Sequence, residues 1–442
     1  MANGTWTTQN KVSPGVYINF KSAARPLGTV GERGVAAFPA SLPWGPSGLI
    51  KLEAATFLQN ALKLLGFNAA DARIRHIAAA MAHASQVLIY RLGAKNAVKA
   101  TAAIGNLTAT AKYGGSRGND LQIVVQASVD QPDAYEVRTL LEGEEVDAQI
   151  VGSAEALVSN DFVTFAGSGE LTETAGTALA GGKEGTGGNG DWTDALTALE
   201  AEEFDVLGLP TDDSALKQLA VAYTKRLRDD EGKKFVTVLY NYPQADYEGV
   251  ISLKNSVITA EGLTVEPISL LWEIAAMEAG AAVNESLTYA EIPNAVDVTP
   301  KLTYSETIKA LQNGELVLTA ANGKVQIQQD INTFKTFTPE KAKHFSKNRV
   351  VRVLDTIARD IQRTFGASYI GKVGNNADGR NLLKGEVLSY LGTLQGIGAI
   401  QNFNAETDLE VLPGIDGDAV VINLSVQPVD SIEKIYMTVT VN

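Results

Sequence analysis

Two stretches of alternating hydrophobic and polar residues predict half-buried β-strands at the two ends of the chain. In "SPGVYINF", Val16, Ile18 and Phe20 share one face and follow a Pro-Gly turn signal. In the second stretch, "EKIYMTVTV", the residues of one face are Ile435, Met437, Val439 and Val441. No turn or returning strand follows it, and an unpaired flat strand invites association with another chain. The partner of this strand is therefore the first question that the sequence raises.

The periodicity between these ends changes several times. Helical patterns cover residues 54–65 and 70–84, and "VLIYRLG" then predicts a strand. From about residue 100 to 182, short strand-like runs follow one another without a long helix, which predicts an inserted antiparallel β-sandwich or barrel. The glycine-rich stretch "GGKEGTGGNG" closes it, and its composition is typical of a flexible hinge. Helices and strands alternate over residues 191–338, which implies an α/β layer.

Two helices carry start signals that can be named. "DWTDALTALEAE" predicts a helix with Asp191 as its N-cap. "TPEKAKHFSKNRVVRVLDTIARDIQRTF" predicts a long amphipathic helix, with Thr338 as the cap and Pro339 in the first position. The apolar stripe of this long helix consists of Val350, Leu354, Ile357, Ile361 and Phe365. A further helix over about residues 381–395 and two strands complete the chain.

These patterns predict an α+β multidomain protein. It would combine an α/β core domain, an inserted antiparallel β-sandwich or barrel, and a C-terminal helix-plus-sheet domain with terminal strand arms. A length of 442 residues agrees with two to four domains. The predicted boundaries are 1–30 for the N-terminal arm, 31–99 and 183–338 for the two parts of the core, 100–182 for the inserted domain, 339–429 for the C-terminal domain and 430–442 for the C-terminal arm.

The composition excludes several classes of site. The chain has no cysteine, so it has no disulfide, no thiolate zinc site and no cysteine nucleophile. Its start, "MANGTWTTQNKV", lacks the apolar core of a signal peptide, and no apolar run approaches the ~20 residues of a membrane span. The richest run, "LLWEIAAMEAGAAV", contains Glu273 and Glu278. We therefore expect a soluble protein, without membrane insertion, that is made in a cytoplasm.

Charge is distributed unevenly along the chain. The net charge of −14 argues against nucleic acid as a direct partner. Residues 101–338 hold 15 Lys+Arg against 36 Asp+Glu, whereas residues 1–100 hold 11 against 3. The acidic middle is either simply well hydrated, or it faces solvent while the two ends face partners.

A basic run stands out in this acidic chain. Residues 341–363 hold seven Lys+Arg against two acidic residues, Asp355 and Asp360. Its first five cations are Lys341, Lys343, Lys347, Arg349 and Arg352. The run is either a solvated helix face or a docking face for an acidic partner.

The motifs that could carry catalysis fail on their context. "GTGGNG" matches the dinucleotide fingerprint, but no strand precedes it, and Asp191 and Asp194 would stand where a phosphate must bind. "GGSRG" has the spacing of a nucleophile elbow around Ser116, yet a strand follows where a helix is required. His76 and His83 are seven residues apart, which is not a metal-ligand spacing. We expect no enzyme activity, no metal and no cofactor.

Several of these segments together resemble the tail sheath proteins of contractile-tailed bacteriophages and of phage-tail-like bacteriocins. "SPGVYINF" is similar to the N-terminal arm of that family, and "DWTDALTALEAEEFDVLGLP" to the entry of its α/β domain. "ELVLTAANGKVQIQQDINTFKTFTPEKAKHFSKNRVVRVLDTI" and "VVINLSVQPVDSIEKIYMTVTV" resemble its C-terminal half. The resemblance is greatest to sheaths of Gram-positive phages and defective prophages. It covers most of residues 1–30 and 190–442 and is weak over 100–182.

The resemblance implies a structural function. Subunits of such sheaths form stacked six-membered rings around an inner tube, and they contract to drive the tube through a cell envelope without consuming a nucleotide. It implies as partners further copies of the chain, the tail tube protein, and the baseplate and tail terminator proteins. It also implies a place in the virion tail after assembly in the host bacterial cytoplasm. The alternatives are another self-assembling tube or shell protein, or an α/β enzyme with a nucleotide at the glycine-rich segment.

The resemblance also suggests what the terminal strands pair with. Arms of sheath proteins cross to neighbouring subunits and add strands to a neighbour's sheet. The residues that this implies for the arms are Val16, Tyr17, Ile18, Phe20, Ile435, Tyr436, Met437, Val439 and Val441. The five cations at the start of the basic run become candidates for facing the tube.

Overall fold

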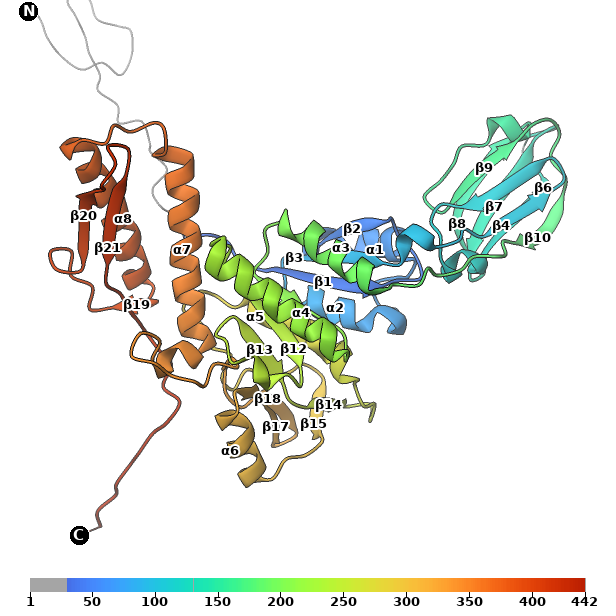
Figure 1. Cartoon of the computed structure of the whole chain (residues 1–442). Coiled ribbons are helices and arrows are strands. Elements are labelled where there is room, and N and C mark those ends of the chain that lie inside the picture. The colour runs from blue at the N-terminus through green and yellow to red at the C-terminus, as the bar shows by residue number, and fades with distance from the viewer. Residues whose placement is uncertain (1–29, 130, 442) are drawn as a thin grey trace, which may run out of the picture. The chain divides into compact units, whose positions relative to one another are not determined.

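The structure is a computed structural model that describes residues 30–129 and 131–441 (Figure 1). The described chain divides into two compact units. The larger unit contains residues 32–356 and 429–441, and the smaller unit contains residues 357–428 together with Val30 and Gly31. The predicted N-terminal strand, with Val16, Tyr17, Ile18 and Phe20, lies outside the described residues.

The larger unit is built on a seven-stranded sheet with the order β16-β13-β12-β11-β1-β3-β2. Its strands are β1 (Val35–Ser41), β2 (Gly48–Glu53), β3 (Gln86–Leu92), β11 (Val206–Gly208), β12 (Val236–Tyr240), β13 (Val250–Leu253) and β16 (Glu315–Leu316). All neighbouring strands are parallel except β2 and β3, which are antiparallel. A parallel sheet is buried on both faces, which explains the nearly continuous apolar runs of its strands.

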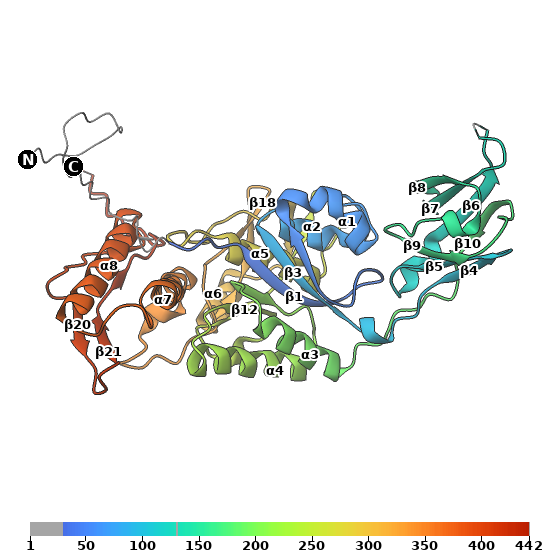
Figure 2. The same ribbon diagram turned by 90° about the horizontal axis from the view of Figure 1, so that it is seen from above.

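Helices cover both faces of this sheet (Figure 2). One face carries α1 (Phe57–Leu65), α2 (Arg75–Met81) and α5 (Pro267–Gly280), and the other carries α3 (Asn189–Glu200) and α4 (Ser214–Lys225). Successive residues of β3 alternate between the two layers: Val87 and Ile89 enter the core under α5, and Leu88 enters the core under α3. The structure thus confirms the α/β layer that the sequence predicted.

Smaller elements complete the larger unit beyond this sheet. They are the antiparallel pair β14 (Ser256–Thr259) and β15 (Ala295–Thr299), the hairpin β17 (Leu318–Ala321) and β18 (Lys324–Ile327), and α6 (Tyr304–Gln312). A capping box starts α6, because Thr303 and Glu306 each accept a hydrogen bond from the other's backbone N–H.

The inserted domain is a β-sandwich and not a barrel. One sheet has the order β10-β6-β7-β8 and the other β4-β5-β9, and every strand pair is antiparallel. The strands are β4 (Thr101–Ile104), β5 (Leu107–Ala111), β6 (Leu121–Ala127), β7 (Tyr135–Leu141), β8 (Glu144–Val151), β9 (Val163–Gly167) and β10 (Thr174–Ala178). Trp44 and Leu62, which precede the domain in the chain, pack against its core. The sandwich is therefore seated on the α/β part through apolar contacts.

The first residues of the glycine-rich stretch after the sandwich pack against the preceding chain, which the prediction of a flexible hinge did not include. The N–H groups of Val98 and Lys183 each donate to the other's carbonyl, over 2.8 and 3.1 Å. Gly185 lies so close to Gly93 that a Cβ atom on it would come within 1.9 Å of the Gly93 carbonyl oxygen. Glycine is needed here because two backbones approach closely, rather than because the chain must bend.

The smaller unit consists of helices and short antiparallel pairs. It contains the second half of α7 (Asn348–Ser368), α8 (Ala377–Gly396), the hairpin β20 (Leu409–Pro413) and β21 (Val420–Leu424), and the pair β19 (Ile400–Gln401) and β22 (Gln427–Pro428). This agrees with the predicted helix-plus-sheet character of the C-terminal domain.

The predicted start of the long helix was wrong by about ten residues. Helix α7 begins at Asn348, not after Thr338. The carbonyl oxygen of Ser346 accepts from the Asn332 N–H at 3.1 Å, and that of Phe345 accepts from the Asn332 side chain at 2.9 Å. These two carbonyl oxygens accept hydrogen bonds from Asn332 instead of from the N–H groups of a helical turn. The helix therefore begins after them.

The predicted cap of α3 was also displaced. The N-cap is Gly188, and Asp191 is the third residue of the helix, where its carboxylate accepts from the Gly188 N–H at 3.1 Å. An acidic side chain in the first turn still favours the helix, because it faces the positive end of the helix dipole.

Candidate functional site

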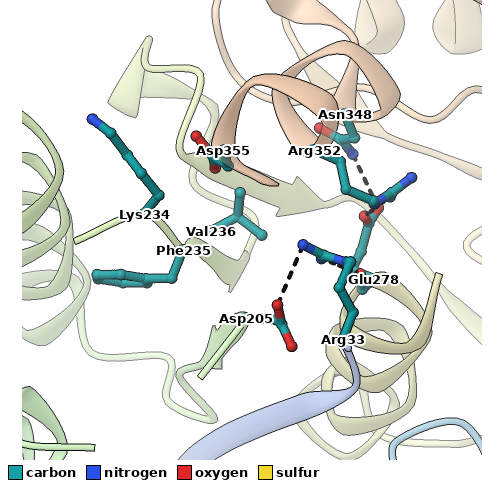
Figure 3. Close-up of a pocket in the computed structure, with 9 residues that line it drawn as sticks. All are labelled: Arg33, Asp205, Lys234, Phe235, Val236, Glu278, Asn348, Arg352 and Asp355. Atoms are coloured by element: carbon teal, nitrogen blue, oxygen red, sulfur yellow. Dashed lines mark hydrogen bonds and ion pairs between the residues drawn. The ribbon is translucent and has the colours of Figure 1, made fainter. Parts of the chain in front are cut away.

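Charged side chains gather around a small cavity where α7 begins (Figure 3). The lining residues are Arg33, Asp205, Lys234, Phe235, Val236, Glu278, Asn348, Arg352 and Asp355. Asn348, Arg352 and Asp355 follow one another at helical spacing, so α7 presents all three on one face. The first turns of α7 thus carry a polar face into the larger unit.

The centre of this cluster is the ion pair between Arg352 and Glu278, which come from α7 and α5. Arg352 Nη2 lies 2.6 Å from Glu278 Oε2, and the two side chains are 3% and 2% exposed. Asp330 follows β18, and its Oδ2 lies 3.7 Å from the same Nη2. The Asn348 side-chain amide donates to Glu278 Oε1 at 3.0 Å and to Asp330 Oδ1 at 2.7 Å. Two carboxylates therefore share one guanidinium and one amide.

Two further pairs surround this centre. Arg228, in the π-helical turn after α4 (Arg226–Asp230), donates to both oxygens of Asp355 at 2.6 and 2.9 Å. Arg33 Nη1 lies 3.3 Å from Asp205 Oδ1, and Asp205 Oδ2 accepts from the Gly34 N–H at 2.8 Å. Because breaking a buried pair leaves an uncompensated charge, each pair favours a single placement of the elements that carry it.

The shared guanidinium has a consequence for the protonation of Glu278. Burial disfavours its charged form and the Asp330 carboxylate repels a second negative charge, so the pKa of Glu278 is raised to about 8 even though Arg352 opposes the shift. We infer that the Glu278–Asp330 pair retains one proton at neutral pH. The cluster of Arg352, Glu278 and Asp330 then carries one positive and one negative charge. With both carboxyl groups ionised, it would carry a second negative charge that no cation of the cluster balances.

This arrangement is suited to holding α7 in place rather than to catalysis. The carboxyl groups of Asp355 and Glu278 in the cavity accept hydrogen bonds from arginine or amide groups. His76 lies elsewhere, with its ring 5.0 Å from that of Trp272, and burial lowers its pKa to about 4. Ser116 Oγ donates to the Glu184 carboxylate at 2.6 Å in an exposed position, outside this cavity. Over residues 30–129 and 131–441, no group of three or more His, Asp or Glu side chains could hold a metal ion.

The C-terminal arm, described here over residues 430–441, exposes its apolar side chains. Its exposed hydrophobic residues are Ile432, Ile435, Tyr436, Met437, Val439 and Val441, with exposed fractions from 75% to 90%. Within the described chain, no strand pairs with residues 434–441, which run as an extended coil (Figure 1). The strand that the sequence predicted here is therefore not formed with any described part of the same chain.

One residue of the C-terminal arm, Glu433, is held by the larger unit. Its carboxylate forms an ion pair with Lys347 and accepts from Thr288 Oγ1 at 2.9 Å and from Gln329 Nε2 at 2.6 Å. Sequence reasoning missed this contact, because nothing in a single acidic residue of an alternating stretch indicates a partner.

The five predicted tube-facing cations do not form one exposed surface. Lys343 is exposed and Arg349 is half-buried. Lys341 pairs with Glu248, and Lys347 pairs with Glu433. Arg352 is buried in the cavity described above, so it cannot face a partner in this conformation. The sequence grouped these residues as one helical face, whereas α7 starts only after Lys347.

Comparisons with known proteins agree on one family along the chain. Residues 95–184 match the phage tail sheath protein β-sandwich domain, residues 185–333 the phage tail sheath protein central domain, and residues 340–442 the phage tail sheath C-terminal domain. The part of the chain that the structure describes contains no helix long and apolar enough to cross a membrane.

Individual relatives extend this likeness to the full length. The phage-like element PBSX protein XkdK of Bacillus subtilis is 36% identical over 100% of both chains. The crystal structure of a sheath tail protein from Desulfitobacterium hafniense is 47% identical, with a TM-score of 0.87 over 96% of this chain and 99% of that one. The contracted sheath of the anti-feeding prophage shares the fold at 14% identity, with a TM-score of 0.60 over 98% of this chain and 100% of that one.

The shared proton predicts how stability depends on pH. Since the pKa of Glu278 is raised from 4.5 to about 8, the folded state binds one more proton than the unfolded state between these values. This proton is bound below pH 4.5 in both states, and the stability linked to it is lost as pH rises toward 8, by up to about 1.4 kcal/mol per pH unit. Glu278→Gln stays neutral at all pH values and removes this slope. Melting temperatures of both proteins between pH 5 and 8 should therefore diverge, with the wild type falling relative to the variant; a constant difference would contradict the shared proton.

Proposed function

This chain belongs to the family of phage tail sheath proteins, and we propose that its terminal arms join neighbouring subunits in the sheath. It is a structural subunit of a contractile tail sheath. The observation that carries the proposal is the C-terminal arm, whose alternating apolar residues are exposed on a chain that otherwise buries a large core.

Strand addition explains this exposure. The predicted strand face of Ile435, Met437, Val439 and Val441 needs a cover, because each such side chain gains ~1.5–3 kcal/mol on burial. A neighbouring subunit can supply both the cover and the main-chain hydrogen bonds of a sheet edge. The N-terminal residues Val16, Tyr17, Ile18 and Phe20 have the same alternation, and we propose the same role for them.

A second part of the proposal concerns the inner tube. Lys343 is exposed, and Arg349 is half-buried one residue into α7. We propose that these two residues contact an acidic surface of the tail tube. Lys341 is a third candidate, although it already forms an ion pair with Glu248. Baseplate and tail terminator proteins are the further partners that we propose, and the host cytoplasm is the proposed place of assembly.

The proposed mechanism consumes no nucleotide. The energy for contraction would lie in packing between subunits, and the arms would keep subunits connected while they move. The buried charges around α7 support this proposal, because they hold the first turns of α7 in place next to Lys347, which binds Glu433 of the C-terminal arm.

The arm can be tested by removing the strand and leaving its root. A chain that ends at Lys434 keeps Glu433 with its three partners and loses residues 435–442. Since the removed side chains are exposed in the subunit, its melting temperature should stay within about 1 °C of the full chain, which corresponds to about 1 kcal/mol for a chain of this length. The full chain should form hollow tubes in negative-stain images, and the shortened chain should stay monomeric in sedimentation velocity.

Two outcomes would contradict this role of the arm. Tubes formed by the shortened chain would show that assembly does not need the strand. A shortened chain that fails to fold would show that the strand belongs to the subunit's own core. Removal of residues 1–20 provides the parallel test for the N-terminal arm and should likewise prevent tubes.

The tube contact can be tested with Lys343→Glu. Reversal of an exposed charge that meets an acidic surface weakens association, and added salt should reduce the difference between variant and wild type. We expect the variant to fold and to assemble with itself, but to co-sediment less with the co-expressed tail tube protein. Lys99→Glu is a matched control, because Lys99 is an exposed lysine outside the basic run. Equal recovery of the tube protein with wild type and Lys343→Glu would rule this contact out.

A further inference from the structure

At the start of the C-terminal arm, an acidic side chain is buried and the apolar side chain next to it is exposed. Around its root, the acidic residue Glu433 turns toward the larger unit, and its side chain is only 11% exposed. Ile432, its neighbour, points outward and is 87% exposed. Folded chains normally bury isoleucine and expose glutamate. The root of the arm therefore contacts its own subunit through polar groups and leaves its apolar groups for something else.

The site that receives Glu433 is formed by three separate segments. Thr288 lies in the loop after α5, Gln329 follows β18, and Lys347 directly precedes α7. Together they place a hydroxyl, an amide and an ammonium group on the two carboxylate oxygens. Burial alone would raise the pKa of Glu433, but the hydrogen bonds from Lys347 and Gln329 and the charge of Lys347 outweigh it, so its pKa is lowered and the carboxylate is charged at neutral pH.

The receiving groups are themselves held in place. Thr288 Oγ1 accepts from the Asp330 N–H at 3.0 Å, and Lys347 forms an isolated β-bridge with Ile331. Asp330 in turn belongs to the buried charge cluster with Arg352. A charge-assisted bond to preorganised groups fixes direction better than a bond to mobile surface side chains.

We propose that Glu433, with Lys347, Thr288 and Gln329, forms a clamp that positions the C-terminal arm for pairing with a second copy of this chain. The proposal rests on the proposed function, because the arm must pair outside its own subunit. The clamp fixes the point from which the arm leaves, and residues 434–441 then span at most ~29 Å when fully extended. Glu433 is a positioning residue, and the strand beyond it makes the contact.

The physical gain is preorganisation. Without the clamp, residues 429–433 would also have to be ordered when the arm binds, and a longer free segment lowers the effective concentration of the strand at the neighbour. The clamp therefore strengthens assembly without adding a contact between subunits, and its loss should weaken assembly without unfolding the subunit.

Three full-length variants test the clamp. Glu433→Lys places a like charge against Lys347. Asp430→Lys is the matched control, because it makes the same charge change at an exposed position of the same arm. The double variant Lys347→Glu with Glu433→Lys restores an opposite pair. The first measurement is the mobility of a nitroxide spin label attached to Ile432→Cys in the monomer, which is a unique site because the sequence has no cysteine and an exposed one because Ile432 is 87% exposed. The second is the protein concentration at which half of the chain sediments as polymer.

The clamp predicts a distinct pattern in both measurements. In Glu433→Lys, the label should change from a restricted to a freely moving spectrum and the polymerisation threshold should rise at least tenfold, while the melting temperature changes little. Asp430→Lys should behave as wild type, and the double variant should recover most of both effects. An unchanged label spectrum in Glu433→Lys would overturn the clamp, as would a loss of assembly in Glu433→Lys that the double variant does not recover.

The clamp and the arm can fail separately. If the chain that ends at Lys434 still polymerises as the full chain does, the arm is not needed and the proposed function of the arm fails. If that shortened chain does not polymerise but Glu433→Lys polymerises at the wild-type threshold, the arm stands and the clamp is wrong.

Discussion

Burial of opposite charges around the first turns of α7 is the constraint on which the rest of the subunit depends. Taking an ion out of water costs several kcal/mol, and only a well-placed partner offsets this cost. Arg352 must meet Glu278 on α5, and Asp355 must meet Arg228 after α4. The first turns of α7 therefore have one position within the larger unit at which all of these charges are paired. Any rotation or shift of its first turns would leave a charge buried and alone.

In each unit, one segment that leads toward a terminus of the chain is also bound, taken separately. In the larger unit, Glu433 of the C-terminal arm is bound by Lys347, the residue before α7. In the smaller unit, the Gly31 N–H donates to both carboxylate oxygens of Asp360 on α7, at 3.1 and 3.0 Å, and Tyr390 donates to the same carboxylate. A carboxylate thus fixes each segment that leads to a terminus. Under the proposed role of the arms, these contacts would pass a force on an arm to the residues that bind it.

The sequence predicted those features that depend on local periodicity. Strands of the α/β layer, the inserted β-sandwich and the stripe with Val350 and Ile357 on α7 follow from patterns of period two and 3.6. The start of α7 was misplaced because Asn332, in a segment preceding the helix, captures two carbonyls that a helix would need. Glu278 was visible as a charge inside an apolar run, but its partner Arg352 is 74 residues away. Glu433 gave no signal at all, because long-range partners of a single acidic residue leave no periodic trace in the sequence.

A double-mutant cycle between Arg352 and Glu278 tests most directly whether buried charge pairing holds α7. The variants are Arg352→Met, Glu278→Leu and the combination of both, and the measured quantity is the free energy of unfolding in urea. Arg352→Met removes the positive charge that the two carboxyl groups share, and Glu278→Leu removes the carboxyl group that lies 2.6 Å from the guanidinium, so each single change should cost about 3–5 kcal/mol. Because the double variant removes both partners of this contact, its loss should be smaller than the sum of the single losses by about 2 kcal/mol or more. Losses that add within about 0.5 kcal/mol would contradict the claim, because they would show that the two side chains stabilise the subunit independently.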